Sequence, residues 1–314
     1  MKISFKNPYK FKFHWFIFCY LFFEKKEYIW QKLFNELAFI LVKKKINFFT
    51  VGYYKKNIFK LRVTNTQFSS IFSFSKTFYE PEVYATIIDQ LPKGGVFVDV
   101  GSNWGHHSII ASKEKNATIY AFEANPSSAQ DLKDICSDLK LKNFYIYNCA
   151  LGKNKKKTLI TQFSYKSGFA STSTKFIQKY YNPNNFSFFK KLFKPEPIKI
   201  NVNQNKLDNI LAHTKVDLIK VDIEGSELNC LLGAKKTLKA NNCKVIFEIH
   251  TNNKGNFIKF KNFFNSLGYE MYIITVDIKL GKVFYTKCNN LLPNTQYNLL
   301  ASKQKLFQKR FYKI

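Results

Sequence analysis

The fold of this chain is decided by the stretch Gly95-Val96-Phe97-Val98-Asp99-Val100-Gly101-Ser102-Asn103-Trp104-Gly105. An apolar run that ends in Asp-x-Gly-x-x-x-Gly is typical of a buried parallel strand that turns sharply into a helix. A second apolar run, Tyr120-Ala121-Phe122-Glu123, ends on a carboxylate. It follows the first glycine by about 20 residues, the spacing of the acid that binds a nucleotide ribose. The two blocks predict an adenosine-bearing cofactor at the carboxyl edge of a doubly wound sheet.

The glycine spacing indicates which cofactor this is. A dinucleotide site has Gly-x-Gly-x-x-Gly, because a pyrophosphate must approach the helix N-terminus. Here the order is Gly101-x-Asn103-x-Gly105, and the third glycine of that pattern is missing. S-adenosylmethionine has no pyrophosphate; it needs a glycine turn near its amino-acid end and a carboxylate for its ribose. Asp99 and the two glycines would supply the turn, and Glu123 the carboxylate. The plain alternative is that the glycines only make a tight turn.

A third strand ends at Asn148-Cys149-Ala150-Leu151-Gly152, where an adenine edge would lie. Asn148 and Ala150 are therefore candidate cofactor contacts. An ordinary exit from a strand into a turn explains the same residues equally well.

Acidic residues follow the next strand, in Val216-Asp217-Leu218-Ile219-Lys220-Val221-Asp222-Ile223-Glu224-Gly225-Ser226-Glu227. Open α/β sheets bind ligands at this edge. Glu227 near a helix start has a simple explanation, because it favours the helix dipole and caps free amides. Asp222 does not, since a carboxylate that ends an apolar strand is costly unless it has a task.

One further strand ends in Glu248 and His250. We predict that Asp222, Glu248 and His250 are the catalytic residues. When S-adenosylmethionine transfers its methyl group to an alcohol, a positioned base that removes the hydroxyl proton accelerates the reaction by roughly 10²–10⁴-fold. Asp222, Glu224 and Glu248 could instead hold Mg²⁺ or Mn²⁺, which would acidify the hydroxyl. Hydrogen bonding behind the reacting groups explains the same acids without an ion.

The chain divides by composition into three regions. Residues 1–90 are basic and aromatic, with helical spacing from Glu24 to Lys45; residues 91–288 alternate strands and helices. Residues 289–314 form a basic tail whose apolar side chains, Leu300 among them, fit one helical face, either docked on the core or on an anionic membrane. A segment at 164–197 interrupts the alternation and is a candidate lid. Strands are predicted near 95–100, 117–123, 143–149, 216–222, 243–249, 269–276 and 281–286, and helices at 105–114, 127–139, 227–240 and 256–266.

The net charge of +29 over 314 residues comes almost entirely from lysine, since only Arg62 and Arg310 are arginines. It indicates either a surface for phosphate-rich partners or compositional drift. The six cysteines form no Cys-x-x-Cys pair, which favours a reducing compartment. The apolar run Trp15–Phe23 is shorter than the roughly 20 residues that cross a membrane. We therefore expect a cytoplasmic protein, with peripheral contact at the inner membrane face as an option.

Taken together, these blocks resemble the FkbM-type family of S-adenosylmethionine-dependent methyltransferases. The resemblance spans about Leu91 to Val276. Asn103 in place of a glycine is characteristic of that family, whereas Ala124 stands where the family commonly has proline. The matching segments are Phe97–Gly105, Ala121–Pro126, Ala150–Gly152, Leu207–Asp208, Ile219–Glu227 and Phe247–Ile249.

The resemblance implies an α/β, Rossmann-like class I methyltransferase fold with a mostly parallel doubly wound sheet. We add an antiparallel edge strand and a helical N-terminal extension. The resemblance implies methyl transfer, usually to a hydroxyl, with Asp99, Gly101 and Glu123 at the cofactor and Asp222 near the acceptor. Family substrates include sugars of surface polysaccharides and glycolipids, and secondary metabolites.

We interpret the chain as an O-methyltransferase for a sugar of a surface glycan or glycolipid precursor. A secondary metabolite is an alternative acceptor. A nucleic-acid methyltransferase is a rival suggested by the charge, but acidic residues beside the target would repel phosphate. A nicotinamide oxidoreductase is disfavoured by the glycine spacing, and a membrane-associated binding protein without activity is the non-enzymatic alternative. Oligomeric state is open.

Overall fold

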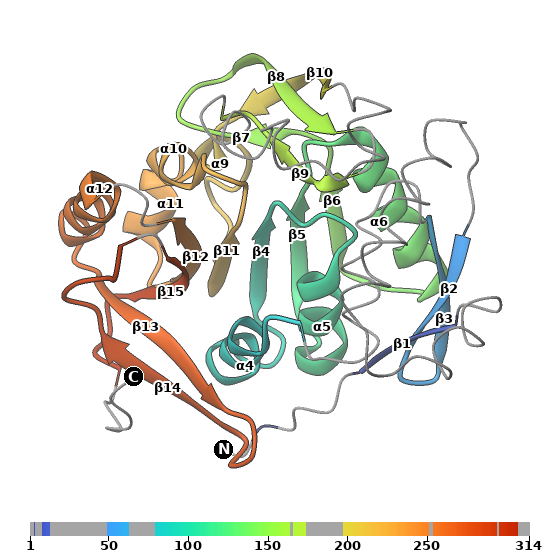
Figure 1. Ribbon diagram of the computed structural model, residues 1–314, viewed down its shortest axis with the longest axis horizontal. Helices are drawn as coiled ribbons and strands as arrows, with labels where there is room; N and C mark the ends of the chain where they lie inside the picture. The colour runs from blue at the N-terminus through green and yellow to red at the C-terminus, as the bar shows by residue number, and fades with distance from the viewer. Residues whose placement is uncertain are drawn as a thin grey trace, which may run out of the picture.

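The computed structural model describes residues 3, 8–12, 49–62, 79–163, 166–173, 197–250, 254–293 and 295–306. Its centre is an eight-stranded sheet of order β14-β13-β15-β12-β11-β4-β5-β6 (Figure 1). The two middle strands, β11 and β4, lie where the chain order reverses, which is where open α/β sheets bind ligands. The predicted doubly wound, mostly parallel α/β fold is confirmed.

Five neighbouring strands run parallel, and their sequences are nearly continuous apolar runs because helices cover both faces of the sheet. In β4 the last four residues are all buried, Asp99 included. The sequence predicted every one of these strands to within about two residues. They are β4 (Val96–Val100), β5 (Thr118–Phe122), β6 (Phe144–Tyr147), β11 (Leu218–Val221) and β12 (Lys244–His250).

The other end of the sheet contains antiparallel strands. The predicted edge strand is β14 (Lys282–Lys287), which pairs with β13 (Glu270–Asp277). Between β13 and β12 lies β15 (Gln296–Ser302), antiparallel to both. The expected helix that includes Leu300 is therefore wrong, and the boundary at 288 cuts off a strand of the sheet. Residues 307–314 of the tail lie outside the described residues.

The helix prediction fails because residues 296–302 form a strand that is buried on both faces of the sheet. Leu300 packs into the hydrophobic core on one side of the sheet, whereas Leu299 and Ala301 pack into the core on the other side. A strand covered on both faces has no polar alternation, so a short apolar run gives no reliable period.

Helices pack on the two faces. One face carries α4 (Pro81–Gln90), α5 (His106–Lys115) and α6 (Pro126–Asp138). The other carries α9 (Leu207–Ile210), α10 (Glu227–Leu232), α11 (Lys235–Ala240) and α12 (Lys254–Asn265).

The predicted helix at 227–240 is in fact two helices, α10 and α11. The carboxylate of Asp208 accepts the backbone N–H groups of Lys236 at 3.0 Å and Thr237 at 2.8 Å. These amides would otherwise lack partners in the first turn of a helix. A side chain distant in sequence thus stabilises a new helix start at this point.

A smaller four-stranded sheet of order β7-β10-β8-β9 lies above the carboxyl ends of the central strands (Figure 1). It consists of β7 (Ala150–Leu151), β8 (Lys156–Phe163), β9 (Lys166–Ser171) and β10 (Pro197–Asn205). The segment 164–197 therefore begins as β9 and ends where β10 starts. Residues 174–196 lie outside the described residues, and a lid there stays a prediction.

The described part of residues 1–90 contains an antiparallel sheet of β1 (Tyr9–Lys12), β2 (Phe49–Tyr54) and β3 (Asn57–Arg62). The segment from Glu24 to Lys45, expected to be helical, lies outside the described residues. This three-stranded sheet contacts the main domain through Phe59, whose ring stacks on Trp104 with centroids 6.3 Å apart. None of the described helices is long and apolar enough to cross a membrane.

Candidate active site

A cavity of about 430 Å³ opens at the carboxyl ends of β4, β5, β11 and β12. Its floor is the loop after β4, and its roof includes Ile160, Ala170 and Thr172 of the smaller sheet and the segment that follows β9. Ser171 donates a hydrogen bond to the carbonyl of Glu224 at 2.7 Å, which ties that roof to the loop after β11. The size and partial enclosure suit a small-molecule cofactor together with part of an acceptor.

The glycine loop after β4 is shaped by close backbone approach. Gly101 has φ +79°, and a Cβ there would lie 1.9 Å from the carbonyl oxygen of Asp222. Gly105 has φ +92°, and a Cβ there would lie 2.3 Å from Leu132. Both positions exclude other residues. The glycines do make a tight turn, and the same turn exposes the loop to the cavity.

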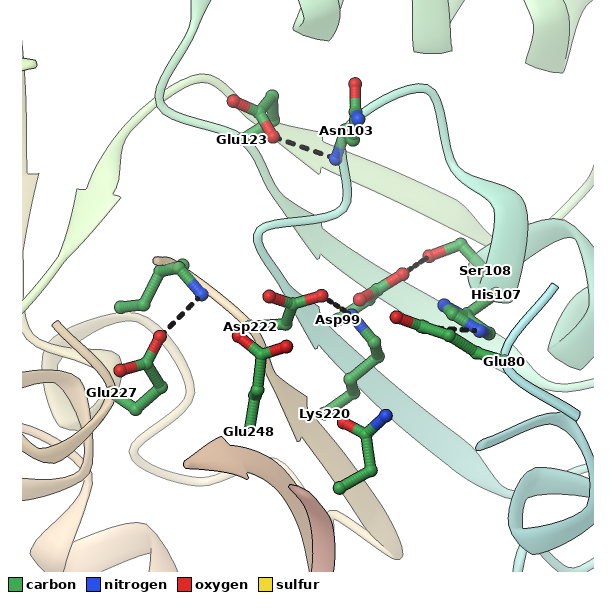
Figure 2. A network of polar contacts seen from close by, with 12 residues as sticks. Glu80, Asp99, Asn103, His107, Ser108, Glu123, Lys220, Asp222, Glu227 and Glu248 are labelled. Atoms are coloured by element: carbon green, nitrogen blue, oxygen red, sulfur yellow. Dashed lines mark hydrogen bonds and ion pairs between the residues drawn. The ribbon is translucent and has the colours of Figure 1, made fainter. Parts of the chain in front are cut away.

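Glu123 links this loop to the end of β5. One carboxylate oxygen accepts the backbone N–H of Asn103 at 2.8 Å, as Figure 2 shows, and the other accepts that of Asn125 at 2.7 Å. Burial raises the pKa of Glu123 to about 7, although the two N–H donors act in the opposite direction. Asn103 adopts φ +50°, which asparagine tolerates better than most residues. Its buried Oδ1 has no hydrogen-bond partner within the described part of the chain.

The remaining predicted cofactor residues divide into two groups. Ala150 lines the cavity, together with Cys149 and Leu151. Asn148 is exposed and lies outside the lining; its amide donates to the carbonyls of Glu123 at 2.8 Å and Ala124 at 3.2 Å. Asn148 thus supports the loop that carries Glu123 rather than facing the cavity.

The opposite end of the cavity is rich in charge. Asp222 forms an ion pair with Lys220, with Nζ and Oδ2 2.9 Å apart. Asp99, the neighbour of Lys220 across the β4–β11 pairing, accepts a hydrogen bond from Ser108 at 2.6 Å. Burial raises the pKa of Asp99, whereas Lys220 and Ser108 act to lower it. Figure 2 shows these side chains grouped around the Lys220 ammonium.

The predicted catalytic residues Glu248 and His250 adjoin Asp222. Glu248 lies beside Asp222 in Figure 2 and interacts with Gln296 and His250, whose Nε2 is 3.1 Å from its Oε2. His250 itself is not part of the cavity lining. The pKa of Glu224 is raised to about 10, mainly by burial and to a smaller extent by the charges of Asp222 and Glu248.

The residues that could hold a cation differ from the predicted set. Among the described residues, possible ligand atoms of Glu224, Glu248 and His250 lie within 4.8 Å of one another. Asp222, which the prediction included, is paired with Lys220 instead. Glu227 has a structural task, since one of its oxygens accepts the N–H groups of Ile223 at 3.1 Å and Gly225 at 2.9 Å.

Four titratable residues that the sequence analysis does not assign to the site line the cavity: Glu80, His106, His107 and Lys220. Lys220 stands between apolar residues in the sequence, and only the structure shows that it is buried beside Asp222. Glu80, directly before α4, has φ +44° and lines the cavity; its Oε2 lies 3.4 Å from Nε2 of His107. Burial raises the pKa of Glu80 to about 8 and lowers that of His106 to about 3. Two histidines directly after a glycine turn predict either a contact with cofactor or substrate or, more commonly, an exposed helix start. The exposed helix start is wrong, since His106 and His107 are 6% and 5% exposed.

Comparison with known proteins agrees with this geometry. The family model of the methyltransferase FkbM domain matches residues 99–271, more than half of the chain. The hexuronic acid methyltransferase AglP of Haloferax volcanii is 25% identical over 186 residues, which cover 54% of this chain and 62% of AglP. The chain thus aligns with less than two thirds of that relative.

Solved structures with similar folds include a methyltransferase FkbM from Methylobacillus flagellatus KT, at a TM-score of 0.44 and 14% identity. The match covers 70% of this chain and 47% of that one. TYW2 of M. jannaschii, solved in complex with AdoMet, has a TM-score of 0.40 and 12% identity, covering 81% and 84%.

Proposed function

The chain belongs to the FkbM family of S-adenosylmethionine-dependent methyltransferases, and from this premise we propose that it methylates a hydroxyl of a sugar in a glycan or glycolipid precursor. One observation carries the proposal: a single cavity joins a glycine loop with Glu123 at one end to a cluster of carboxylates at the other. The first end suits the cofactor and the second suits an acceptor with several hydroxyls.

The residues at the loop end fit S-adenosylmethionine. Glu123 keeps lone pairs on both oxygens after accepting one N–H each, so it can also accept hydrogen bonds from ribose hydroxyls. Oδ1 of Asp99 and Oδ1 of Asn103 are buried acceptors without hydrogen-bond partners among the described residues. Buried acceptors of this kind are costly unless a ligand donates to them. Asp99 lies two residues before Gly101 and opposite Lys220, between the two ends of the cavity, and its Oδ1 could accept from the ammonium of the methionine end. The bound cofactor supplies an electrophilic methyl group.

Asp222 is the residue we assign to the acceptor hydroxyl. It ends a buried strand at the cavity, it is partly exposed, and its carboxylate is held by Lys220. Hydrogen bonding to this carboxylate would orient the hydroxyl and take up its proton, which contributes roughly 10²–10⁴-fold. Glu248 and His250 support Asp222 from the neighbouring strand. Positioning of the oxygen in line with the methyl group supplies much of the remaining acceleration.

The acceptor class rests on the relative and on the charges. AglP acts on a hexuronic acid by its name, and carboxylates are good acceptors for the several hydroxyls of a sugar ring. Among the described residues that line the cavity, Lys220 is the only lysine or arginine, and it is already paired. A nucleic-acid backbone would bring phosphate to these carboxylates, which makes a sugar the better candidate.

The proposed acceptor suggests where in the cell the protein acts. We place the protein in the cytoplasm, with the basic surface that a charge of +29 requires available for peripheral contact with anionic lipids on the inner membrane face. Lipid-linked sugar precursors would be within reach there.

Mass spectrometry of surface glycans and glycolipids tests the function. Cells with the intact protein are compared with cells that carry Asp222→Ala. Cells that carry Asp134→Asn, which changes an exposed aspartate on α6, are the control. We expect one methyl group to be lost from a defined sugar with Asp222→Ala only. Unchanged spectra, with cofactor binding verified by calorimetry, would redirect the search to secondary metabolites or RNA.

A further inference from the structure

We propose that Lys220 is a positioning residue of this enzyme, which holds the Asp222 carboxylate in the orientation that acceptor binding requires. The inference rests on the proposed role of Asp222. It goes beyond that role because Lys220 faces a carboxylate and is not assigned a contact with cofactor or acceptor.

The burial of Lys220 is the first argument. It lies in the middle of β11 between Ile219 and Val221, and its side chain is only 4% exposed. Burying an ammonium group in a sheet interior costs several kcal/mol unless it is paired. Among the described residues its ion-pair partner is Asp222, with Nζ and Oδ2 2.9 Å apart. This interaction therefore offsets the cost of burying the Lys220 ammonium, which packing alone would not.

The charges around Lys220 are the second argument. Carboxylates face it from three directions: Asp222 from the loop after its own strand, Asp99 from β4, and Glu80 from the segment before α4 (Figure 2). Burial acts to lower the pKa of Lys220, but these carboxylates raise it above its ordinary value. Lys220 thus stays a cation within a group of acids.

The consequence concerns Asp222. Glu248 lies beside Asp222 in Figure 2, so without Lys220 the Asp222 carboxylate would face this neighbouring acid with no compensating cation. Its orientation would no longer be held by an ion pair, and it would be poorly placed to accept the proton of an acceptor hydroxyl.

The experiment uses full-length protein with Lys220→Met, Lys220→Arg, Asp222→Asn and the double variant Lys220→Met/Asp222→Asn. The acceptor probe is a glycolipid extract of cells that carry Asp222→Ala, and incorporation of labelled methyl from S-adenosylmethionine is measured. We expect Lys220→Met to lower kcat about 100-fold, within the range for loss of a general base. The cofactor Kd should change less than threefold. Lys220→Arg should restore most of the activity.

The double variant separates a positioning role from an independent one. If Lys220 acts through Asp222, replacing Lys220 should lower kcat by less than about twofold once Asp222 is already Asn, because the effects of coupled residues are not additive. The proposal would be overturned if the two single losses in kcat multiply in the double variant, or if Lys220→Met loses cofactor binding. Thermal unfolding checks that each variant folds, and Lys220→Gln serves if Lys220→Met does not.

A readout without acceptor keeps this inference apart from the proposed function. Crystal structures of the wild type, Lys220→Met and Lys220→Gln, solved without acceptor, should show the Asp222 carboxylate in one orientation in the wild type and displaced in both variants. An Asp222 carboxylate that does not move contradicts the role of Lys220. A displaced carboxylate together with no methyl transfer by the wild type would leave the ion pair supported and reject the sugar acceptor.

Discussion

The two ends of the cavity are built from different parts of the chain. At the end proposed for the cofactor (the cofactor end), backbone groups form the surface: the Gly101–Gly105 loop approaches its neighbours closely, and Glu123 is held by two N–H donors. At the end proposed for the acceptor (the acceptor end), side chains from β4, β11, β12 and the segment before α4 meet around Lys220. Backbone geometry is specified by local sequence, whereas a cluster of charges depends on the sheet order. The following substitutions test whether the two ends behave independently.

Asp222→Asn should produce the largest effect, and only at the acceptor end. Asn keeps the shape of the side chain but cannot take up a proton, so we expect kcat to fall by roughly 10²–10⁴-fold with cofactor affinity retained. Methyl transfer kinetics and calorimetry of S-adenosylmethionine binding measure the two quantities. An equal loss of cofactor affinity would show that the ends are not separate.

Gly101→Ala should disrupt the cofactor end and the fold together. Its new Cβ would meet the carbonyl oxygen of Asp222 at 1.9 Å, so we expect about 2–4 kcal/mol lower free energy of unfolding from strain and overpacking. Gly94→Ala is the matched control, since Gly94 has φ +73° but open space around its Cα. Urea denaturation compares the two. Equal losses would mean that backbone conformation alone, and not close approach, requires the glycine.

Glu123→Gln should weaken cofactor binding without changing the acceptor end. Loss of charge-assisted hydrogen bonds costs about 1.5–3 kcal/mol, or roughly 10- to 100-fold in Kd. Because the pKa of Glu123 is raised to about 7, wild-type affinity should fall as pH drops through that value and the carboxylate gains a proton. Calorimetry between pH 5.5 and 8.5 measures this, and Glu123→Gln should remove the dependence.

Glu224→Gln should have the smallest effect, on stability. The pKa of Glu224 is raised to about 10 by burial and by neighbouring carboxylates. The folded state therefore binds its proton more tightly than the unfolded state, and stability is lost as pH rises above the ordinary carboxyl range. We expect Glu224→Gln to be neutral near pH 5 and to stabilise by about 1–2 kcal/mol near pH 8. Denaturation at the two pH values checks this, and equal effects at both would contradict the shift.

Much of the fold was predictable because the decisive residues are local. The strands that end at Val100, Phe122 and Val221 are runs of apolar residues followed directly by a glycine or an acid. This pattern located their ends to within about two residues. The strand at 296–302 was not, since its burial on two faces hides its period. The break between α10 and α11 was not either, because Asp208 supplies the cap from elsewhere in the chain.

The amino-acid sequence by itself determined the glycine loop, the position of the Glu123 carboxylate and the family, since each depends on residues a few positions apart whose backbone conformation or spacing is restrictive. Only the tertiary structure decided which acids meet. It paired Asp222 with Lys220, grouped Glu224 with Glu248 and His250, and brought Glu80 and His107 to the same cavity. These contacts depend on which strands become neighbours, and strand order is a property of the packed core and not of any one segment.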